Sequence, residues 1–358
     1  MSALDRVLGR QVRHVTPRIG SELAAAVCRQ ITDDVGAVLP PYLAHLPAPD
    51  VLAACWAITR EPSVGTAAAR RVKEAVAAAV SATNACPYCL DVHTATLYAL
   101  DSPEAGSAIA AGRDELIPDP ELRKVVDWAR ATRSPGAEIL AAPPFTEQAA
   151  AELVGTALAY HYINRMVSVF LVDSPFGLRS GEVVKRGIKR LAVPVTRRAL
   201  RRAGPSGQSL EFLPETEDRG EFGWASSDPV IAAAFRSSAA VFDAAARRFL
   251  AEPVQDLVRE RLRRWRGEPA PLSAAWVEED VVELPAPHRP AGRLTLLVAL
   301  APYQVGERVL GEFRATTPGG EQALVAAAGW ASFTATLRVG EWIWTPATTP
   351  RTATASRP

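Results

Sequence analysis

The pattern of apolar and polar positions along the chain is helical almost throughout. In the segment 119–132, "DPELRKVVDWARAT", positions 122, 125, 126 and 129 are apolar and lie on one helical face. Asp119 can cap this helix, and Pro120 suits its first turn. Alanine-rich segments at 65–82 and 147–170 favour helix by propensity. Only the short segments 280–286 and 340–349 look strand-like, so we expect an all-α fold.

The second half of the chain echoes the first half. Three echoes occur in the same order: "VLAACW" at Val51 and "VIAAAF" at Val230, "AAARR" at Ala67 and Ala244, and long alanine-rich segments beginning at Glu147 and Glu321. Repeated order of this kind indicates duplication of one helical unit. A constant offset places Arg263 and Arg266 where the first copy has Cys86 and Cys89, so the second copy is expected to lack the dithiol.

The echoes divide the chain into four parts. Residues 1–178 form the first helical domain, 179–222 a connector, 223–344 a degenerate repeat, and 345–358 a tail expected to be disordered. The connector is basic between 179 and 202 and turns acidic at 211–221. A basic amphipathic helix bound to a membrane or an acidic partner is one interpretation. Gly187 and Pro194 limit helix length there, so we favour a solvated connector docked on its own domain.

Length, charge and cysteine content narrow the class of protein. A chain of 358 residues can form two ordinary domains, and a formal net charge of +1 gives no indication of a nucleic-acid partner. Residues 1–30 contain no apolar block of the signal-peptide type, and the uncharged run 75–90 is shorter than a membrane span. We therefore expect a cytoplasmic protein without a membrane partner. Cys28 and Cys55 stand alone and are expected to be buried apolar residues.

The segment "ACPYCLDVH" at 85–93 holds two of the four cysteines and one of the five histidines. Pro87 predicts a helix start there, with Cys86 at the cap and Cys89 in the third helical position. His93 follows Cys89 by four residues, so both lie on one helical face. A helix start favours a thiolate and can lower a cysteine pKa. In a reducing compartment such a pair is more often catalytic or metal-bound than a structural disulfide.

The longer segment "KEAVAAAVSATNACPYCLDVHTATL" resembles the core motif of the alkylhydroperoxidase D (AhpD)-like and carboxymuconolactone decarboxylase superfamily. In that motif a Glu precedes Cys-x-x-Cys-x-x-x-His by twelve residues, and Glu74, Cys86, Cys89 and His93 match all four positions. The resemblance covers about residues 45–175. It implies an all-helical, usually oligomeric fold and a peroxide-reducing dithiol with no cofactor or metal. Some peroxidase members carry a second His just before the second Cys, where this chain has Tyr88.

The resemblance implies a role for each matched residue. Cys89 would be the peroxidatic thiolate that becomes a sulfenic acid, and Cys86 would resolve it to a disulfide. His93 would act as general base on Cys89, and Glu74 would orient His93. The substrate would be a hydroperoxide, and the external dithiol reductant a dihydrolipoamide-bearing or thioredoxin-like protein.

Other interpretations stay open. Tyr88 and His161 are candidates for lining the site, although His161 could instead satisfy a helix end or a subunit contact. Glu74 could face solvent, and His93 could be a satisfied core histidine. A decarboxylase-type lyase acting on a small organic acid and a zinc-binding structural module are the alternative functions. The duplication predicts either a pseudo-dimeric monomer or a smaller homo-oligomer than single-unit relatives form.

Overall fold

The computed structural model describes residues 2–175, 203–218 and 220–344, together with 187, 189, 190, 193, 196 and 197. Within these residues the structure is helical, and its only β-structure is an isolated bridge between Val12 and Leu171. The all-α prediction is confirmed. The predicted tail at 345–358 and most of the basic part of the connector lie outside the described residues.

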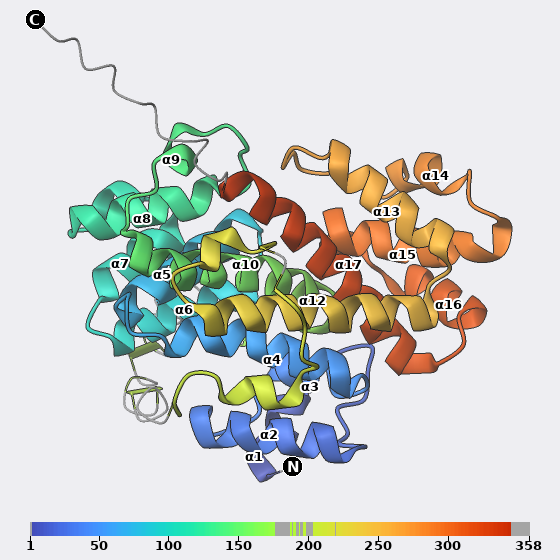
Figure 1. Cartoon of the computed structure of the whole chain (residues 1–358), viewed down its shortest axis with the longest axis horizontal. Coiled ribbons are helices and arrows are strands. Elements are labelled where there is room, and N and C mark those ends of the chain that lie inside the picture. The colour runs from blue at the N-terminus through green and yellow to red at the C-terminus, as the bar shows by residue number, and fades with distance from the viewer. Residues whose placement is uncertain are drawn as a thin grey trace, which may run out of the picture.

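The first half supplies a helical bundle and an N-terminal layer (Figure 1). Its helices are α1 (Ala3–Gly9), α2 (Glu22–Val35), α3 (Pro40–Leu43), α4 (Pro49–Val64), α5 (Arg70–Thr83), α6 (Pro87–Ala99), α7 (Pro103–Ala111), η1 (Asp114–Leu116), α8 (Pro120–Ala131), α9 (Glu138–Ala141) and α10 (Glu147–Phe170). The Asp119 side chain accepts hydrogen bonds from the backbone N–H groups of Glu121 and Leu122, so the predicted cap of α8 is present.

The second half is also helical in its described residues. Its elements are η2 (Gln208–Phe212), η3 (Gly223–Ala225), α12 (Pro229–Phe249), α13 (Glu252–Arg264), α14 (Trp276–Val281), η4 (Ala286–His288), α15 (Arg289–Leu300), η5 (Pro302–Gln304), α16 (Glu307–Thr316) and α17 (Gly320–Ile343). Both strand predictions are wrong in the described residues. Segment 280–286 ends α14 and turns, because Val281 and Leu284 are both buried among helices. Residues 340–343 of the second predicted strand form the last turn of α17.

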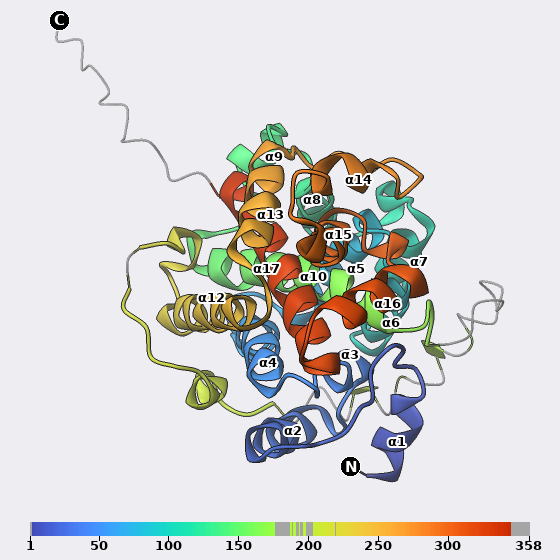
Figure 2. The ribbon, with the colours of Figure 1, turned by 90° about the vertical axis from the view of Figure 1, so that its right-hand side faces the viewer.

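The two halves share one core at the centre of the molecule. Helix α4 packs along α12, and α10 packs along α17 (Figures 1 and 2). Tyr162 of α10, Phe242 of α12 and Phe333 of α17 meet there, with ring centroids 5.1 Å apart for Tyr162–Phe242 and 4.5 Å apart for Phe242–Phe333. Contacts between aromatic rings at these separations stabilise the packing beyond the burial of area. The core is therefore continuous across the boundary between the halves.

Two of the three sequence echoes lie at matching positions of helices in the two halves. Val51 and Val230 lie in the first turns of α4 and α12, and α10 and α17 each contain 24 residues. The predicted equivalence of Arg263 with Cys86 does not hold. Cys86 directly precedes α6, whereas Arg263 lies in the last turn of α13. A constant offset therefore fails in this part of the second half, and the duplication remains a proposal.

Helix α12 is the one described helix whose length and apolar composition suit a membrane span. A little over half of its most apolar window, 56%, is buried inside the protein. Its apolar face packs on α4 and α17. Core helices of this kind commonly pass the same test of length and composition.

Candidate functional site

The dithiol lies at the start of α6, as predicted. Cys86 is the N-cap residue, Pro87 is the first helical residue, and Cys89 is the third. The turn from α5 into α6 is tight. Ala85 adopts a positive φ of 51°, and the Cys86 amide donates to the Ser81 carbonyl at 2.9 Å. Both cysteines are free thiols and are almost fully buried, at 2% and 3% exposure. Cys28 and Cys55 are buried as well, in agreement with their predicted packing role.

Glu74 and His93 form a buried pair between α5 and α6. The His93 Nδ1 atom lies 2.7 Å from a Glu74 carboxylate oxygen, and Arg70 Nε donates to the other carboxylate oxygen at 2.7 Å. Burial alone would raise the pKa of Glu74, but Arg70 and His93 outweigh it and lower the pKa to about 2. Glu74 is therefore an anion that faces His93, and the solvent-facing interpretation is wrong.

The His93 ring is also fixed by α10. Tyr160 packs against it edge-on, with ring centroids 4.3 Å apart. Within the described residues, no hydrogen bond joins His93 to either sulfur atom. The histidine is thus oriented by Glu74 and Tyr160 and lies one helical turn after Cys89.

The electrostatic environment of Cys89 differs from the expectation. Burial raises the pKa of Cys89 well above its usual value, the neighbouring Cys86 raises it further, and a hydrogen bond from Asn164 lowers it. The helix start does not produce a thiolate, because the sulfur is removed from water and desolvation outweighs the partial charges of the helix. The prediction of a lowered pKa is wrong for Cys89 in the reduced protein.

A chain of hydrogen bonds behind Cys89 orients Asn164. The Asn164 amide nitrogen donates to the Ser81 hydroxyl at 3.0 Å, and its side-chain oxygen accepts from the Asn84 amide at 3.0 Å. Ser81 in turn donates to the Ala77 carbonyl at 2.6 Å. Ser81 accepts from the Asn164 side-chain nitrogen and Asn84 donates to the Asn164 side-chain oxygen, so these two partners set the orientation of the amide. Its N–H group is therefore the end that can donate a hydrogen bond to Cys89.

His161 completes this network from the far side. Asn84 also donates to His161 Nδ1 at 3.1 Å, and His161 Nε2 contacts the Thr132 hydroxyl at 2.9 Å. Burial, with Arg165 and Arg133 nearby, lowers the pKa of His161 well below its usual value, so the ring is neutral. His161 therefore supports Asn84 rather than lining a cavity. The sequence reasoning missed Asn84 and Ser81, although a polar residue two positions before Cys86 was a usable signal.

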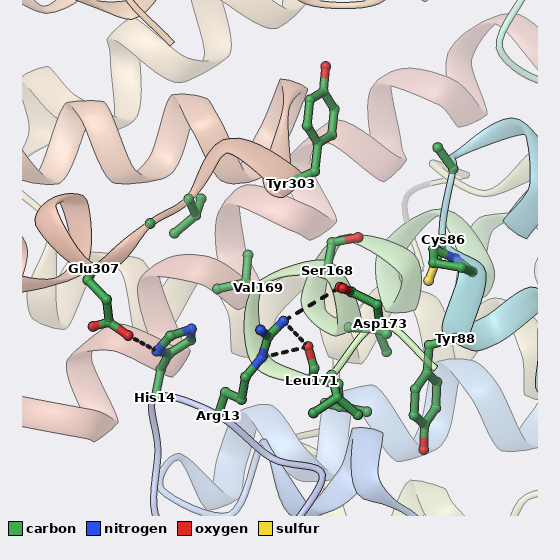
Figure 3. Close-up of a pocket in the computed structure, with 16 residues that line it drawn as sticks. Arg13, His14, Cys86, Tyr88, Ser168, Val169, Leu171, Asp173, Tyr303 and Glu307 are labelled. Atoms are coloured by element: carbon green, nitrogen blue, oxygen red, sulfur yellow. Dashed lines mark hydrogen bonds and ion pairs between the residues drawn. The ribbon is translucent and has the colours of Figure 1, made fainter. Parts of the chain in front are cut away.

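A cavity of about 390 Å³ opens in front of Cys86 (Figure 3). Cys86 and Tyr88 line it, whereas Cys89, His93, Glu74 and His161 do not. The Tyr88 hydroxyl donates to the Gln11 side chain at 2.7 Å. Tyr88 thus lines this cavity, and its hydrogen bond to Gln11 ties the dithiol helix to the N-terminal segment.

The donor set of the zinc alternative is not assembled. Among the described residues, no three His, Cys, Asp or Glu side chains are placed to hold one metal ion. His93 directs its Nδ1 atom to Glu74 instead, at 2.7 Å. A carboxylate on Nδ1 occurs on histidines that transfer protons and on histidines that ligate zinc, so what disfavours a zinc module is that its donor set is not assembled among the described residues.

Comparison with known proteins agrees with this site. The Carboxymuconolactone decarboxylase family matches residues 50–131, which include Glu74, both cysteines of the dithiol and His93. Alkyl hydroperoxide reductase Rv2159c of Mycobacterium tuberculosis is 35% identical over 336 residues, which cover 93% of this chain and 94% of that protein. With a relative this similar along nearly its whole length, the chain belongs to the alkylhydroperoxidase D-like, carboxymuconolactone decarboxylase family.

Proposed function

We propose that this protein is a thiol-dependent peroxidase that reduces hydroperoxides through the Cys86–Cys89 dithiol. The observation that carries the proposal is the pair of reduced cysteines at the start of α6 beside the buried Glu74–His93 pair. The name of the mycobacterial relative, an alkyl hydroperoxide reductase, supports the same chemistry. A cytoplasmic location is part of this proposal, because a reducing compartment returns such a dithiol to its thiol form.

The proposed oxidation has two steps. His93 accepts the Cys89 proton directly or through water, and the Cys89 thiolate attacks the O–O bond of the hydroperoxide. Cys89 becomes a sulfenic acid and the alkoxide leaves as an alcohol after it gains a proton. The Cys86 thiol then attacks the sulfenic sulfur, which releases water and forms the Cys86–Cys89 disulfide. An external dithiol reductant returns both cysteines to thiols.

The surrounding residues assist the first step. Glu74 is held as an anion by Arg70, so it stabilises the imidazolium that forms when His93 takes the proton. Asn164 donates toward the Cys89 sulfur and so stabilises the thiolate. These contacts compensate part of the desolvation that keeps Cys89 protonated at rest.

Thiol titration tests the proposal. The reduced protein should lose two titratable thiols when it is treated with hydrogen peroxide or an organic hydroperoxide, and mass spectrometry should locate a Cys86–Cys89 disulfide. Cys89→Ser should abolish the reaction. Cys86→Ser should react once and leave a sulfenic acid that dimedone traps.

Two results would contradict the assignment. If Cys89→Ser formed the sulfenic acid and Cys86→Ser were inert, the cap cysteine would be the nucleophile. If neither variant differed from the unmutated protein, the dithiol would not be the active group. A decarboxylase-type lyase would then be the better candidate, because it needs no dithiol.

A further inference from the structure

Of the two cysteines of the dithiol, only Cys86 lines the cavity. Cys86 lines the cavity, whereas Cys89 is buried behind it against Asn164 and does not. A reagent that enters the cavity therefore reaches Cys86 first. Once the two cysteines form a disulfide, Cys86 is the sulfur atom that faces such a reagent.

The outer wall of the cavity comes from outside the family core. Four residues of the second half line the cavity: Tyr303 of η5, Val305 and Gly306 of the following loop, and Glu307 at the start of α16. Tyr303 and Glu307 lie across the cavity from Cys86, and Arg13 and His14 of the N-terminal segment line the side below them in Figure 3. Residues 50–131, which match the family, contribute only the part from Ala85 to Tyr88. The shape of the cavity is thus a property of the longer chain.

This wall is held in place by several contacts. The Arg13 amide donates to the Phe170 carbonyl at 2.7 Å, and the Arg13 side chain donates to the Leu171 carbonyl. His14 Nδ1 lies 3.2 Å from the Glu307 carboxylate. The N-terminal segment therefore connects the end of α10 to the start of α16 across the cavity.

We propose that this cavity binds the thiol reductant of the peroxidase cycle, and that the second half of the chain selects it. This inference rests on the proposed function. Cys86 is 2% exposed at the cavity, so a cysteine on the broad surface of a folded protein cannot approach it closely. The cavity accommodates a small thiol or a thiol on a narrow chain.

The charge of the wall specifies the reductant further. Glu307 and Asp173 both line the cavity, with side chains that are 79% and 52% exposed. Arg13 lies 3.8 Å from Asp173 and donates to the Leu171 carbonyl, so the charges of Arg13 and Asp173 offset each other and Glu307 is the remaining carboxylate. Burial lowers the pKa of His14 and leaves it a weak counter-charge for Glu307. Among the residues that line the cavity, Glu307 is thus the surplus charge, and this carboxylate favours an uncharged or cationic thiol over an anionic one.

The reductive reaction is a pair of thiol–disulfide exchanges. The thiolate of the reductant attacks Cys86 Sγ, a sulfur–sulfur bond forms between them, and the Cys86–Cys89 bond breaks. The electron pair leaves with Cys89, whose thiolate gains a proton. A second thiol group then attacks the reductant sulfur of the mixed disulfide, so Cys86 returns to a thiol and the reductant leaves as a disulfide.

A glycine in the wall provides a test of size. A Cβ atom at Gly306 would meet no atom within 4 Å, and the residue has an ordinary φ of −115°. Gly306→Phe should fill part of the cavity and slow reduction of the oxidised protein by dithiothreitol on the order of tenfold or more. Gly306→Ala also replaces the glycine at the start of α16, but it adds only a methyl group. Its rate of reduction should therefore stay near that of the unmutated protein.

A second glycine on the same helix is the matched control. Gly311 also has open space around its Cβ position and does not line the cavity. Gly311→Phe should leave the rate of reduction unchanged. Circular dichroism and a thermal melt of each variant check that it is folded.

The charge of the wall is tested with a series of monothiols. Glu307→Gln should raise the rate of reduction by anionic mercaptoacetate relative to cationic cysteamine, with uncharged 2-mercaptoethanol in between. Removal of one carboxylate near the reacting sulfur should change that ratio about fivefold at low salt, and less at high salt. Glu283→Gln removes an exposed carboxylate that does not line the cavity, so the ratio should not change.

The oxidative reaction separates failure of this inference from failure of the proposed function. Oxidation by hydrogen peroxide, followed as loss of two thiols, should proceed in every variant. If Gly306→Phe blocked oxidation and not reduction, the cavity would admit the peroxide and the inference would be wrong. Equal effects of Phe at 306 and 311, or fast reduction by a thioredoxin that Gly306→Phe left unchanged, would also overturn it. An unmutated protein that peroxide did not oxidise would contradict the proposed function itself.

Discussion

At the scale of single residues, the site combines a buried thiol with a buried, oriented histidine that we propose as its base. Desolvation raises the pKa of Cys89, whereas Glu74 stays ionised beside His93 because Arg70 supports it. A protonated thiol is a poor nucleophile, so the reaction requires transfer of its proton. We propose that His93, which lies on the same helix as the thiol and is held by Glu74 of α5, accepts this proton.

The raised pKa predicts the pH dependence of Cys89 reactivity. Because the folded-state pKa lies above neutral, the thiolate is the minor form at pH 7 and its fraction should increase with pH through pH 9. Alkylation of Cys89 by iodoacetamide, located by mass spectrometry, should follow that rise. In Cys86→Ser the profile should move to lower pH, because Cys86 is one of the groups that raise the Cys89 pKa. A plateau reached below pH 8 in the unmutated protein would contradict this account.

Removal of the base gives a second prediction. His93→Ala should slow oxidation of the dithiol by about 10²–10⁴-fold, which is the usual contribution of a general base. Glu74→Gln should have a smaller effect, since it leaves the imidazole present but without the carboxylate that orients it. Stopped-flow measurement of thiol loss gives both rates. A His93→Ala rate equal to that of the unmutated protein would show that His93 is a packing residue.

At the scale of the helices, α5, α8 and α10 converge behind the dithiol through side-chain amides and a neutral histidine. Asn84 at the end of α5 joins Asn164 and His161 of α10, and His161 joins Thr132 at the end of α8. Buried hydrogen bonds of this kind are costly to leave half made. The network therefore fixes the distance between α10 and the start of α6.

The network predicts different effects for two neighbouring variants. Asn164→Ala and Asn84→Ala should each lower the free energy of unfolding by about 1–3 kcal/mol, because each leaves buried polar groups without partners. Only Asn164→Ala should also raise the Cys89 pKa, since Asn164 alone of the two donates toward that sulfur. Urea unfolding and the pH profile of Cys89 alkylation measure the two effects. Equal pKa changes in both variants would assign Asn164 a purely structural role.

The local part of this site was predictable from the sequence, and its surroundings were not. The start of α6 follows from Pro87, and the contact of Glu74 with His93 was implied by the family resemblance, because helix periodicity alone left a solvent-facing Glu74 open. The raised pKa of Cys89 depends on burial by α10, which no local spacing encodes. The wall at Glu307 comes from the other end of the chain, so only the tertiary structure places it near Cys86.

At the scale of the whole molecule, we propose that the second half is a degenerate copy that covers the first. Helices at matching places in the two halves pack on each other, α4 on α12 and α10 on α17. This is the arrangement that a two-fold dimer of single units would have, because equivalent surfaces meet in such an interface. The chain then contains within itself a contact that separate subunits would otherwise make.

The arrangement predicts a small assembly. The full chain should sediment as a pseudo-dimeric monomer or as a smaller oligomer than single-unit relatives form, because α12 and α17 already cover the faces of α4 and α10. Analytical ultracentrifugation across a range of concentrations measures this. A trimer or hexamer assembled through the first half alone would contradict the proposal.

A close contact between the halves gives a last prediction, at Gly329 of α17. A Cβ atom there would lie 2.9 Å from Val51 of α4 and 3.4 Å from both Phe242 and Tyr162, so any side chain would push the shared core apart. Gly329→Leu should lower the free energy of unfolding by about 1–3 kcal/mol, as overpacking does.

Gly340, on the same helix, is the control. Its added Cβ would make only ordinary contacts, at 3.6 and 3.7 Å from Leu158, so Gly340→Ala should be neutral or stabilising. If the halves are one folding unit, Gly329→Leu should also increase alkylation of the buried Cys55 and Cys89 in the first half, because an opening in the shared core exposes both thiols. Unchanged protection of these cysteines, together with a lowered melting temperature, would instead show that the second half unfolds on its own.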